Sequence, residues 1–307
     1  MTAINAMRFS KESGGMVTDS QGSNDIRKYD ISEKVTLLDD SFIIGGSGSS
    51  SVLNDARAKL TKIYDPKNTS RQNAEALSGI LNESYRSFIE QEMRNRFGFG
   101  VKEFTMGRLT DGTPIGSHLV SPAGELCDGR DTSVREYKQN AFLVIGKDAS
   151  DDCYIYGVPM AMQSRLWSLP FASIGSGMDE SDKVLYEFVR NIPRAGRRDI
   201  DFVKGMAALI RATNRSSDIN PGVGGVPTIA YFTKDGSKIL PEEDSLLATE
   251  IVKATDCKLI PAEDALQALE SLLLNREDYR SIEEKIFCKK DNYSEIMRFL
   301  RGYRVQN

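Results

Sequence analysis

Apolar and polar residues alternate along the first fifty positions of the chain, which is the period of half-buried β-strands. Residues 2–9 follow this pattern, the stretch 11–15 is typical of a turn, and 16–20 resumes the alternation. A second pair of short strands is indicated on either side of the Asp-Asp-Ser turn at 39–41. The N-terminal region is therefore predicted to form two β-hairpins, the second of which ends in a cluster of glycines.

After residue 50 the apolar spacing changes to that of amphipathic helices. The first helical face consists of Val52, Leu53, Ala56, Leu60 and Ile63. Further helices are predicted over 69–97, 183–189 and 201–212, and helical patterns continue from 241 onward. Two buried strands are predicted between these helices, over 141–145 and 153–157. Two sheet layers enclosed by two helix layers would bury all of these apolar faces.

The composition is that of an ordinary globular protein. With 307 residues, 40% hydrophobic content and a mean hydropathy of −0.37, the chain can bury one large core or two modest ones. No run approaches the roughly 20 apolar residues of a membrane span, and no basic-then-apolar signal segment is present, so a cytoplasmic location and no membrane partner are expected. The net charge of −4, with evenly spread lysines and arginines, predicts no nucleic-acid partner.

The cysteines and the histidine limit which metal sites and catalytic mechanisms the sequence predicts. The four cysteines are far apart and show no CxxC spacing, so neither a metal nor a cofactor is expected and free thiols are predicted. They are Cys127, Cys153, Cys257 and Cys288. The single histidine, His118, lies in a Gly- and Pro-containing stretch and is expected to be an exposed loop residue. Since serine and cysteine triads need a positioned histidine, Thr2 is the main candidate for an acyl-transfer nucleophile.

Thr2 directly follows Met1, and removal of Met1 would place a hydroxyl and a free α-amine on one residue. An α-amine titrates near pH ~7.7–8.0, so part of it is unprotonated at neutral pH and can act as a base. Lys34, if it lies near Thr2, would be desolvated and close to another ammonium, both of which lower a lysine pKa, and Asp19 would hold it in place. The plainer alternatives are an ordinary trimmed terminus and a surface lysine on a strand edge.

Several motifs stand in an order that resembles the proteasome β-subunit branch of the N-terminal nucleophile hydrolases. In that family the mature chain opens with threonine, the first hairpin ends in an acidic strand end, a lysine follows, and a small-residue pair precedes the first helix. The matching positions are Thr2, the Thr18-Asp19-Ser20 strand end, Lys34 and Gly45-Gly46. Two later segments are similar as well, the Ala-Ser-Ile-Gly-Ser-Gly turn at 172–177 and the glycine-rich stretch at 217–232.

The resemblance implies roles for individual residues. The catalytic set that it implies is Thr2, Asp19, Lys34, Ser176 and Asp218. The oxyanion and substrate-binding set is Gly46, Ser20 and Gln21, in which Gly46 lends a backbone N–H to the oxyanion hole. The chain departs from the family at Pro221, where a serine is usual, so Ser217 is an alternative to Asp218. Ser176 has an alternative role as the N-cap of the helix that begins near Met178.

The resemblance also implies a fold and an activity. The fold is α+β, a four-layer αββα sandwich over 2–240 with an insertion at about 102–137 and a helical C-terminal extension over 241–307. The insertion is expected to be a long loop or a small subdomain that overhangs the site. The implied activity is that of a threonine-dependent peptidase or amidohydrolase acting on a peptide or protein substrate. Members of this family commonly form homo-oligomeric rings. Leu266–Leu274 is the best candidate for a subunit contact, with packing on its own domain as the alternative. The sequence does not identify an ATPase partner.

Two other functions remain open at this point. A peptide ligase would use the same acyl-enzyme ester but let the amine of another peptide replace water, as in the connectases of methanogenic archaea. A non-catalytic structural subunit, similar to the α-type proteasome subunits, would keep the sandwich without its chemistry. Those subunits extend beyond the nucleophile position and lack the threonine and lysine, whereas Thr2 and Lys34 are both present here.

Overall fold

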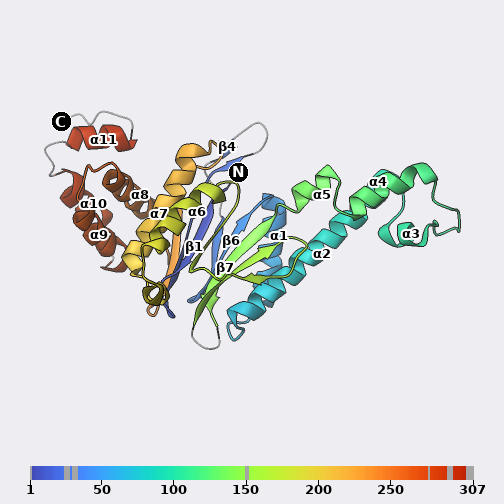
Figure 1. Cartoon of the computed structure of the whole chain (residues 1–307), viewed down its shortest axis with the longest axis horizontal. Helices are drawn as coiled ribbons and strands as arrows, with labels where there is room; N and C mark the ends of the chain where they lie inside the picture. Colours follow the sequence, from blue (N-terminus) through green and yellow to red (C-terminus); the bar gives the residue numbers. More distant parts are fainter. Residues whose placement is uncertain are drawn as a thin grey trace.

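The computed structural model describes residues 2–23, 28–29, 34–148, 152–275, 277–288 and 293–301. The protein is a mixed α/β chain with two five-stranded antiparallel sheets and helices on both sides of them. Figure 1 shows an elongated molecule with the sheets in the middle. The C-terminal helices lie at one end, and a helical arm lies at the other.

The first sheet carries the predicted N-terminal hairpin at its centre. Its strand order is β10-β1-β2-β11-β12, and every neighbouring pair is antiparallel. The strands are β1 (Ile4–Arg8), β2 (Gly14–Thr18), β10 (Phe171–Ile174), β11 (Thr228–Thr233) and β12 (Gly236–Ile239). The prediction of the first hairpin is thus confirmed.

The second sheet contains the second predicted hairpin and both predicted buried strands. Its order is β5-β6-β7-β8-β9, again antiparallel throughout. The strands are β5 (Val35–Asp39), β6 (Phe42–Ser47), β7 (Ala141–Lys147), β8 (Cys153–Pro159) and β9 (Arg165–Leu166). A separate small ribbon pairs β3 (Gly22–Ser23) with β4 (Lys28–Tyr29).

The two sheets pack face to face through an apolar cluster to which both contribute, including Ile4, Met16, Ile43, Leu143 and Ile155. Their approach is close enough to require small residues. A Cβ on Gly45 would lie 2.5 Å from the sulfur of Met16, so only glycine fits there without a shift. The alternating apolar residues of the two hairpins therefore face each other across this core.

Helices cover the outer face of each sheet. On the second sheet lie α1 (Ser50–Ile63) and α2 (Ser70–Phe97), whose apolar faces pack on strands β6, β7 and β8. On the first sheet lie α6 (Met178–Arg190) and α7 (Phe202–Ile219), with the short helix η1 (Arg194–Arg198) between them. The helix predictions are confirmed, and α2 begins with a capping box in which Thr69 and Gln72 exchange hydrogen bonds.

The segment 102–137 is a helical arm and not a long loop. It consists of α3 (Val101–Met106), α4 (Ser117–Cys127) and α5 (Thr132–Tyr137), which pack on the end of α2. The arm has its own small core of Ile89, Met93, Phe99, Ala123, Leu126 and Val134. Of the two interpretations of this segment, the helices and their core fit the small subdomain and not the long loop. His118 is exposed, as predicted, but lies in the first turn of α4.

The C-terminal helices pack behind α7. They are α8 (Glu242–Asp256), α9 (Ala262–Glu270), η2 (Ser271–Asn275), α10 (Tyr279–Glu283), η3 (Glu284–Cys288) and α11 (Tyr293–Arg301). Within Leu266–Leu274, the side chains of Leu269, Leu272 and Leu273 are buried in the core that these helices share with the first sheet, which is the alternative interpretation of this stretch. Among the described residues, no helix combines the length and apolar character needed to span a membrane.

Candidate active site

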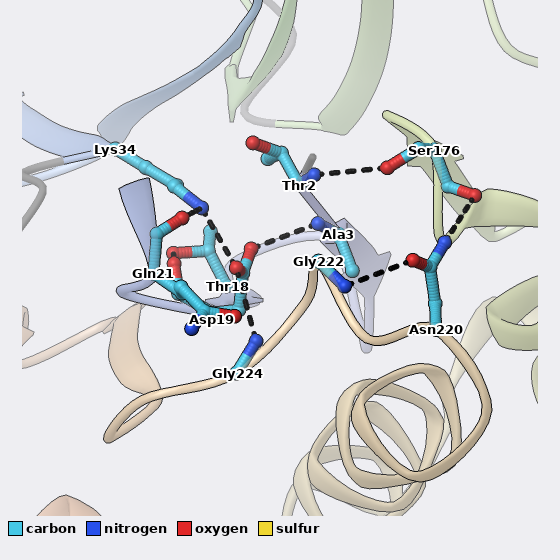
Figure 2. A network of polar contacts seen from close by, with 10 residues as sticks. All are labelled: Thr2, Ala3, Thr18, Asp19, Gln21, Lys34, Ser176, Asn220, Gly222 and Gly224. Atoms are coloured by element: carbon cyan, nitrogen blue, oxygen red, sulfur yellow. Dashed lines mark hydrogen bonds and ion pairs between the residues drawn. The ribbon is translucent and has the colours of Figure 1, made fainter. Parts of the chain in front are cut away.

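Thr2 lies just before β1, where the backbone enters the first sheet, and only 8% of its surface is exposed. Its backbone nitrogen donates a hydrogen bond to Oγ of Ser176 at 3.0 Å, and its carbonyl oxygen accepts one from the N–H of Gly177 at 3.1 Å. In Figure 2, Thr2 has this turn on one side and Lys34 on the other. The Gly-Ser-Gly turn predicted from the sequence thus holds both backbone polar groups of Thr2.

Two glycines allow the turn to close around the threonine. Gly175 has φ +95°, a left-handed backbone that favours glycine, and a Cβ there would lie 2.2 Å from the carbonyl oxygen of Thr2. A Cβ on Gly177 would lie 2.9 Å from that of Ala3. The capping alternative for Ser176 is wrong, since α6 begins at Gly177 as its N-cap and no side chain caps it. Ser176 instead receives the N–H of Thr2.

Asp19 and Lys34 form a buried ion pair beside Thr2. Lys34 Nζ lies 2.8 Å from Asp19 Oδ2, and the two side chains are 5% and 1% exposed. Asp19 directly follows β2, and its Oδ1 accepts the N–H of Ala3 at 2.8 Å, so the carboxylate also fixes the residue next to Thr2. The structure therefore brings together the threonine, the aspartate and the lysine, as the sequence predicts.

One N–H group of the Lys34 ammonium has no hydrogen-bond partner among the described residues. Besides Asp19, its Nζ contacts the carbonyl oxygen of Gln21 at 2.6 Å. A lysine ammonium has three N–H groups, and the contacts among the described residues use two of them. Figure 2 shows Lys34 and Thr2 in the same polar network, which makes the third N–H our candidate donor to a group bound at Thr2.

Burial is the largest influence on the pKa of both members of the ion pair. It lowers the pKa of Lys34 below the usual 10.5, against the opposing attraction of Asp19. It raises the pKa of Asp19, against the opposing effects of Lys34 and of the N–H groups of Ala3 and Gly224. A lysine with a lowered pKa gives up its proton at a pH where an exposed lysine keeps it. The lowered pKa makes Lys34 the candidate for proton exchange in this site.

The role assigned to Gly46 has to be corrected. Its N–H, which the sequence assigned to an oxyanion hole, donates to the carbonyl oxygen of Lys34 at 2.9 Å. Since N–H groups point alternately to the two sides of a strand, the next N–H on this edge belongs to Gly48. The oxyanion candidate thus moves two residues along the chain, just beyond the end of β6.

Gly48 has the backbone and the surroundings that such a donor needs. It is exposed, its φ is +134°, and a Cβ there would lie 2.2 Å from Oδ1 of Asn140. The end of β6 also lies near the threonine. Ser47 Oγ is 3.1 Å from the point where a Gly175 Cβ would stand, and that point is 2.2 Å from the carbonyl oxygen of Thr2.

Ser20 and Gln21, predicted to border the substrate, lie in supporting positions. The N–H of Gln21 donates to the carbonyl oxygen of Gly224 at 2.9 Å, and its own carbonyl accepts from Lys34, so both backbone groups are engaged. The Ser20 hydroxyl is buried and has no hydrogen-bond partner among the described residues. These residues shape the back of the site.

Asp218 is not part of this cluster. It is exposed on the last turn of α7, and none of the polar contacts given for the described residues joins it to Thr2 or Ser176. Asn220 takes the position next to the turn instead. Its Nδ2 donates to the carbonyl oxygen of Ser176 at 3.1 Å, and its Oδ1 accepts the N–H of Gly222 at 3.2 Å (Figure 2).

Sequence reasoning also missed two serines beneath the turn. Ser216 Oγ donates to the carbonyl oxygen of Gly177 at 2.8 Å and lies 2.7 Å from the hydroxyl of Ser181. Both side chains are fully buried. A signal for Ser216 exists in the sequence, since it follows Ala212 by four residues on the buried face of α7. No comparable signal marks Ser181.

Comparisons with known proteins add no further information on the site. Neither a scan against models of protein families nor a search among curated proteins found a match to this chain. Within the described ranges, no group of histidine, cysteine and carboxylate side chains is arranged to hold a metal ion, and the four cysteines are free thiols. The function has to be inferred from the geometry around Thr2.

Proposed function

We propose that the protein is a threonine-dependent amidohydrolase that cleaves peptide bonds, with Thr2 as its N-terminal nucleophile. One observation carries the proposal. The backbone nitrogen of Thr2 is held by the hydroxyl of Ser176, while the buried pair of Asp19 and Lys34 is anchored to the following residue, Ala3. The candidate nucleophile and the candidate base are both on Thr2, and the candidate proton-transfer group, Lys34, is anchored through Asp19 to the next residue.

The packing of the chain supports membership in the N-terminal nucleophile hydrolase superfamily. Helices α6 and α7 lie on one sheet, α1 and α2 lie on the other, and the two sheets face each other. This packing agrees with the αββα sandwich that the resemblance implies, and we propose that fold for the chain. In our proposal residues 2–240 form that domain, and 102–137 and 241–307 are additions to it.

The proposed reaction begins with the attack of Thr2 Oγ on the carbonyl carbon of a peptide bond. The α-amine of Thr2 takes the hydroxyl proton as general base. It then gives a proton to the leaving nitrogen as the carbon–nitrogen bond breaks, which leaves an ester on Thr2. Water adds to that ester, the carboxylic acid departs, and the hydroxyl is restored.

The other residues stabilise the charges that develop. The third N–H of Lys34 is available to the threonine oxygen, and its lowered pKa favours proton exchange. The N–H of Gly48 is our candidate for the carbonyl oxyanion, an interaction whose loss costs roughly 2.7–4 kcal/mol in measured cases. Ser176 keeps the amine oriented through its hydroxyl.

This mechanism requires a free amine on Thr2. The peptide bond between Met1 and Thr2 therefore has to be cleaved before the protein is active. With that bond intact, the nitrogen of Thr2 is an amide and cannot act as a base. Removal of Met1 is part of the proposal.

Hydrolysis is favoured over ligation by the position of the arm. A ligase needs to keep water from the ester, and the insertion was expected to provide that cover. In Figure 1, α3 and α4 extend beyond the sheets and lie well away from the N-terminus. Within the part of the chain that the structure describes, these two helices do not cover the threonine, so we propose water as the acceptor.

The proposal is tested with the purified chain and a mixture of peptides, followed by mass spectrometry. We expect new carboxyl termini with the wild type and none with Thr2→Ala. Ser49→Ala is the matched control, because this exposed serine follows Gly48 and should keep full activity. Cleavage by Thr2→Ala would remove Thr2 from the mechanism. An added acceptor peptide that appears in the products at the expense of water would instead identify a ligase.

A further inference from the structure

Asn140 is a buried polar residue beside the candidate oxyanion donor. It lies between α5 and β7, and only 2% of its surface is exposed. The pairing of β6 with β7 ends at Ser47 and Ala141, so Asn140 stands one position further, opposite Gly48. An asparagine whose side chain is removed from water needs hydrogen-bond partners, and those of Asn140 connect it to the candidate active site.

The backbone of Gly48 lies directly against this asparagine. A Cβ on Gly48 would lie 2.2 Å from Oδ1 of Asn140 and 2.8 Å from its Cα. The φ of Gly48 is +134°, in the left-handed region that favours glycine, and the chain leaves the direction of β6 here. Backbone pairing with β7 stops before this bend, and the side chain of Asn140 contacts the chain beyond it.

The side chain of Asn140 bridges two segments of the chain. Its Oδ1 accepts the N–H of Ser49 at 2.7 Å, and its Nδ2 donates to the carbonyl oxygen of Tyr137, the last residue of α5, at 2.6 Å. One amide thus serves as acceptor and as donor, which neither a carboxylate nor an apolar side chain can do. The first contact uses the backbone of Ser49, so the control variant Ser49→Ala leaves it intact.

Gly48 is held on both sides. Ser47 before it pairs with Ala141 of β7, and Ser49 after it donates to Asn140. The N–H of Gly48 makes no hydrogen bond to a described residue, so it is available to a bound carbonyl oxygen. An oxyanion donor has to lie within about 3 Å of that oxygen, and a displacement of about 1 Å can lower the rate roughly 10²-fold. The contact of Asn140 with Ser49 supplies this constraint on position.

The other anchor of Asn140 is the last helix of the arm. α5 belongs to the core of the arm through Val134, and the ring of Tyr137 stacks on Phe88 of α2 at a centroid distance of 4.1 Å. α3 and α4 extend away from the sheets, whereas α5 lies at the end of the sheets where the N-terminus lies (Figure 1). The arm is thus connected to the Gly48 segment through Asn140.

We propose that Asn140 positions the oxyanion donor of the proposed reaction. Its contact with Ser49 keeps the N–H of Gly48 directed at the carbonyl oxygen of the cleaved bond, and its contact with Tyr137 links this geometry to the arm. Asn140 acts through the backbone of Ser49, so it is a positioning residue and not a catalytic one. The inference rests on the proposed function for the reaction that it serves, but the hydrogen bond between Asn140 and Ser49 does not depend on catalysis.

Steady-state kinetics of Asn140→Ala test the positioning role. Because the oxyanion forms only as the bond is attacked, kcat should fall at least about tenfold while KM stays within about twofold. Asn73→Ala is the matched control and should keep both constants. Asn73 is also 2% exposed, but it lies in the same turn of α2 as Ser70, whose hydroxyl bonds Lys147 at the other end of β7. An equal fall of kcat in both variants, or an unchanged kcat in folded Asn140→Ala, would overturn the proposal.

Hydrogen exchange of the Ser49 amide tests the contact without reference to activity. Relative to intrinsic rates, NMR of the wild type should show exchange at least about tenfold slower at Ser49 than at Ser50. The N–H of Ser50 begins α1 and has no partner among the described residues. Asn140→Ala should remove the difference, and Asn140→Asp, which keeps an acceptor oxygen for Ser49, should preserve it. Equal exchange at Ser49 and Ser50 in the wild type would overturn the proposal even if no variant folds.

Together the two measurements distinguish failure of this inference from failure of the proposed function. Peptide cleavage by a wild type in which Ser49 and Ser50 exchange equally would refute the role of Asn140 alone. Slow exchange at Ser49 in a wild type that cleaves no peptide would refute the proposed function, and with it the part of Asn140 in catalysis.

Discussion

Two ion pairs of the described residues, the buried pair of Lys34 and Asp19 and the partly buried pair of Arg301 and Glu250, differ in what their cations can do. Beside Thr2, Lys34 contacts Asp19 through its ammonium nitrogen, and one N–H group of that ammonium has no partner among the described residues. Among the C-terminal helices, Arg301 of α11 binds both carboxylate oxygens of Glu250 on α8, at 2.6 and 2.7 Å, and also contacts Glu283 on α10. The Lys34 ammonium can donate to one group beside the Thr2 hydroxyl, whereas the Arg301 guanidinium links helices α8, α10 and α11.

This difference separates a group suited to catalysis from one suited to structure. A guanidinium stays protonated at every accessible pH, and its rigid fork matches a carboxylate. An ammonium in a buried site has a lowered pKa and can exchange its proton. Burial of an ion pair is thus no sign of function by itself. In our proposal, the third N–H group and the lowered pKa distinguish Lys34, as a group suited to catalysis, from Arg301.

Exchanging the two cations tests this comparison and should give the largest effect. Lys34→Arg keeps the charge but removes the exchangeable proton, so peptide cleavage should fall by about 10³-fold or more. Arg301→Lys should leave cleavage within about twofold but destabilise the C-terminal helices by roughly 1.5–3 kcal/mol, because the bidentate contact is lost. Steady-state kinetics and denaturant unfolding measure the two effects. Full activity in folded Lys34→Arg would contradict the role of Lys34.

The next effect concerns the turn that holds Thr2. Gly175→Ala would bring a Cβ to 2.2 Å from the carbonyl oxygen of Thr2 and displace the nucleophile. Activity should fall about 10²-fold, as expected for a displacement of about 1 Å. Gly98→Ala is the matched control, since Gly98 also has positive φ, +79°, but nothing lies within 4 Å of its Cβ position. Kinetics and thermal unfolding of both variants separate backbone strain from the clash with Thr2.

The rate of peptide cleavage should depend on pH through the loss of a proton from the α-amine of Thr2. The α-amine, which titrates near pH ~7.7–8.0, acts in its neutral form, whereas Lys34, whose pKa burial lowers from 10.5, acts as an ammonium. The value of kcat/KM should therefore rise about tenfold per pH unit below the pKa of the α-amine, level off above it, and fall once Lys34 loses its proton. Arg301→Lys should show the same profile. A rate that increases on acidification would reverse the assigned proton flow.

The smallest expected losses of activity are those of variants at Asn220 and Asp218, the two candidates for the position next to Ser176. Asn220→Ala removes the contact to the Ser176 carbonyl and should lower activity by roughly 5- to 10-fold, the equivalent of one hydrogen bond. Asp218→Ala changes an exposed residue and should stay within about twofold of the wild type. A larger loss for Asp218→Ala than for Asn220→Ala would restore the assignment made from the sequence.

Much of the fold could be predicted because local patterns determine it. The hairpins at 2–20 and 35–47 follow strand alternation, and α2 has both a helical period and a capping box. The choice between a long loop and a small subdomain at 102–137 could not be made from the sequence, because the short helices are stabilised by contacts with the end of α2, which lie outside any local window. The leucines at 269–273 left a similar choice, since an apolar helix face does not reveal whether its cover comes from the same chain.

The candidate site shows the same limit. Thr2, Asp19, Lys34 and Ser176 were assigned through the resemblance of their motifs to a known family, and the structure places them in one polar network. The choice between Gly46 and Gly48 depends on which way an N–H points, and that follows from strand pairing. The choice between Asp218 and Asn220 depends on where α7 ends, and helix ends are the least predictable part of a helix.

The most direct test of the central claim is the intact mass of the protein before and after reaction with a peptide epoxyketone, which closes a ring with both the hydroxyl and the free amine of an N-terminal threonine. The account predicts a chain that lacks Met1 and carries one adduct, mapped to Thr2. It also predicts a greatly reduced yield in Lys34→Arg. A chain that retains Met1 and gains no adduct would contradict the account and favour a non-catalytic protein.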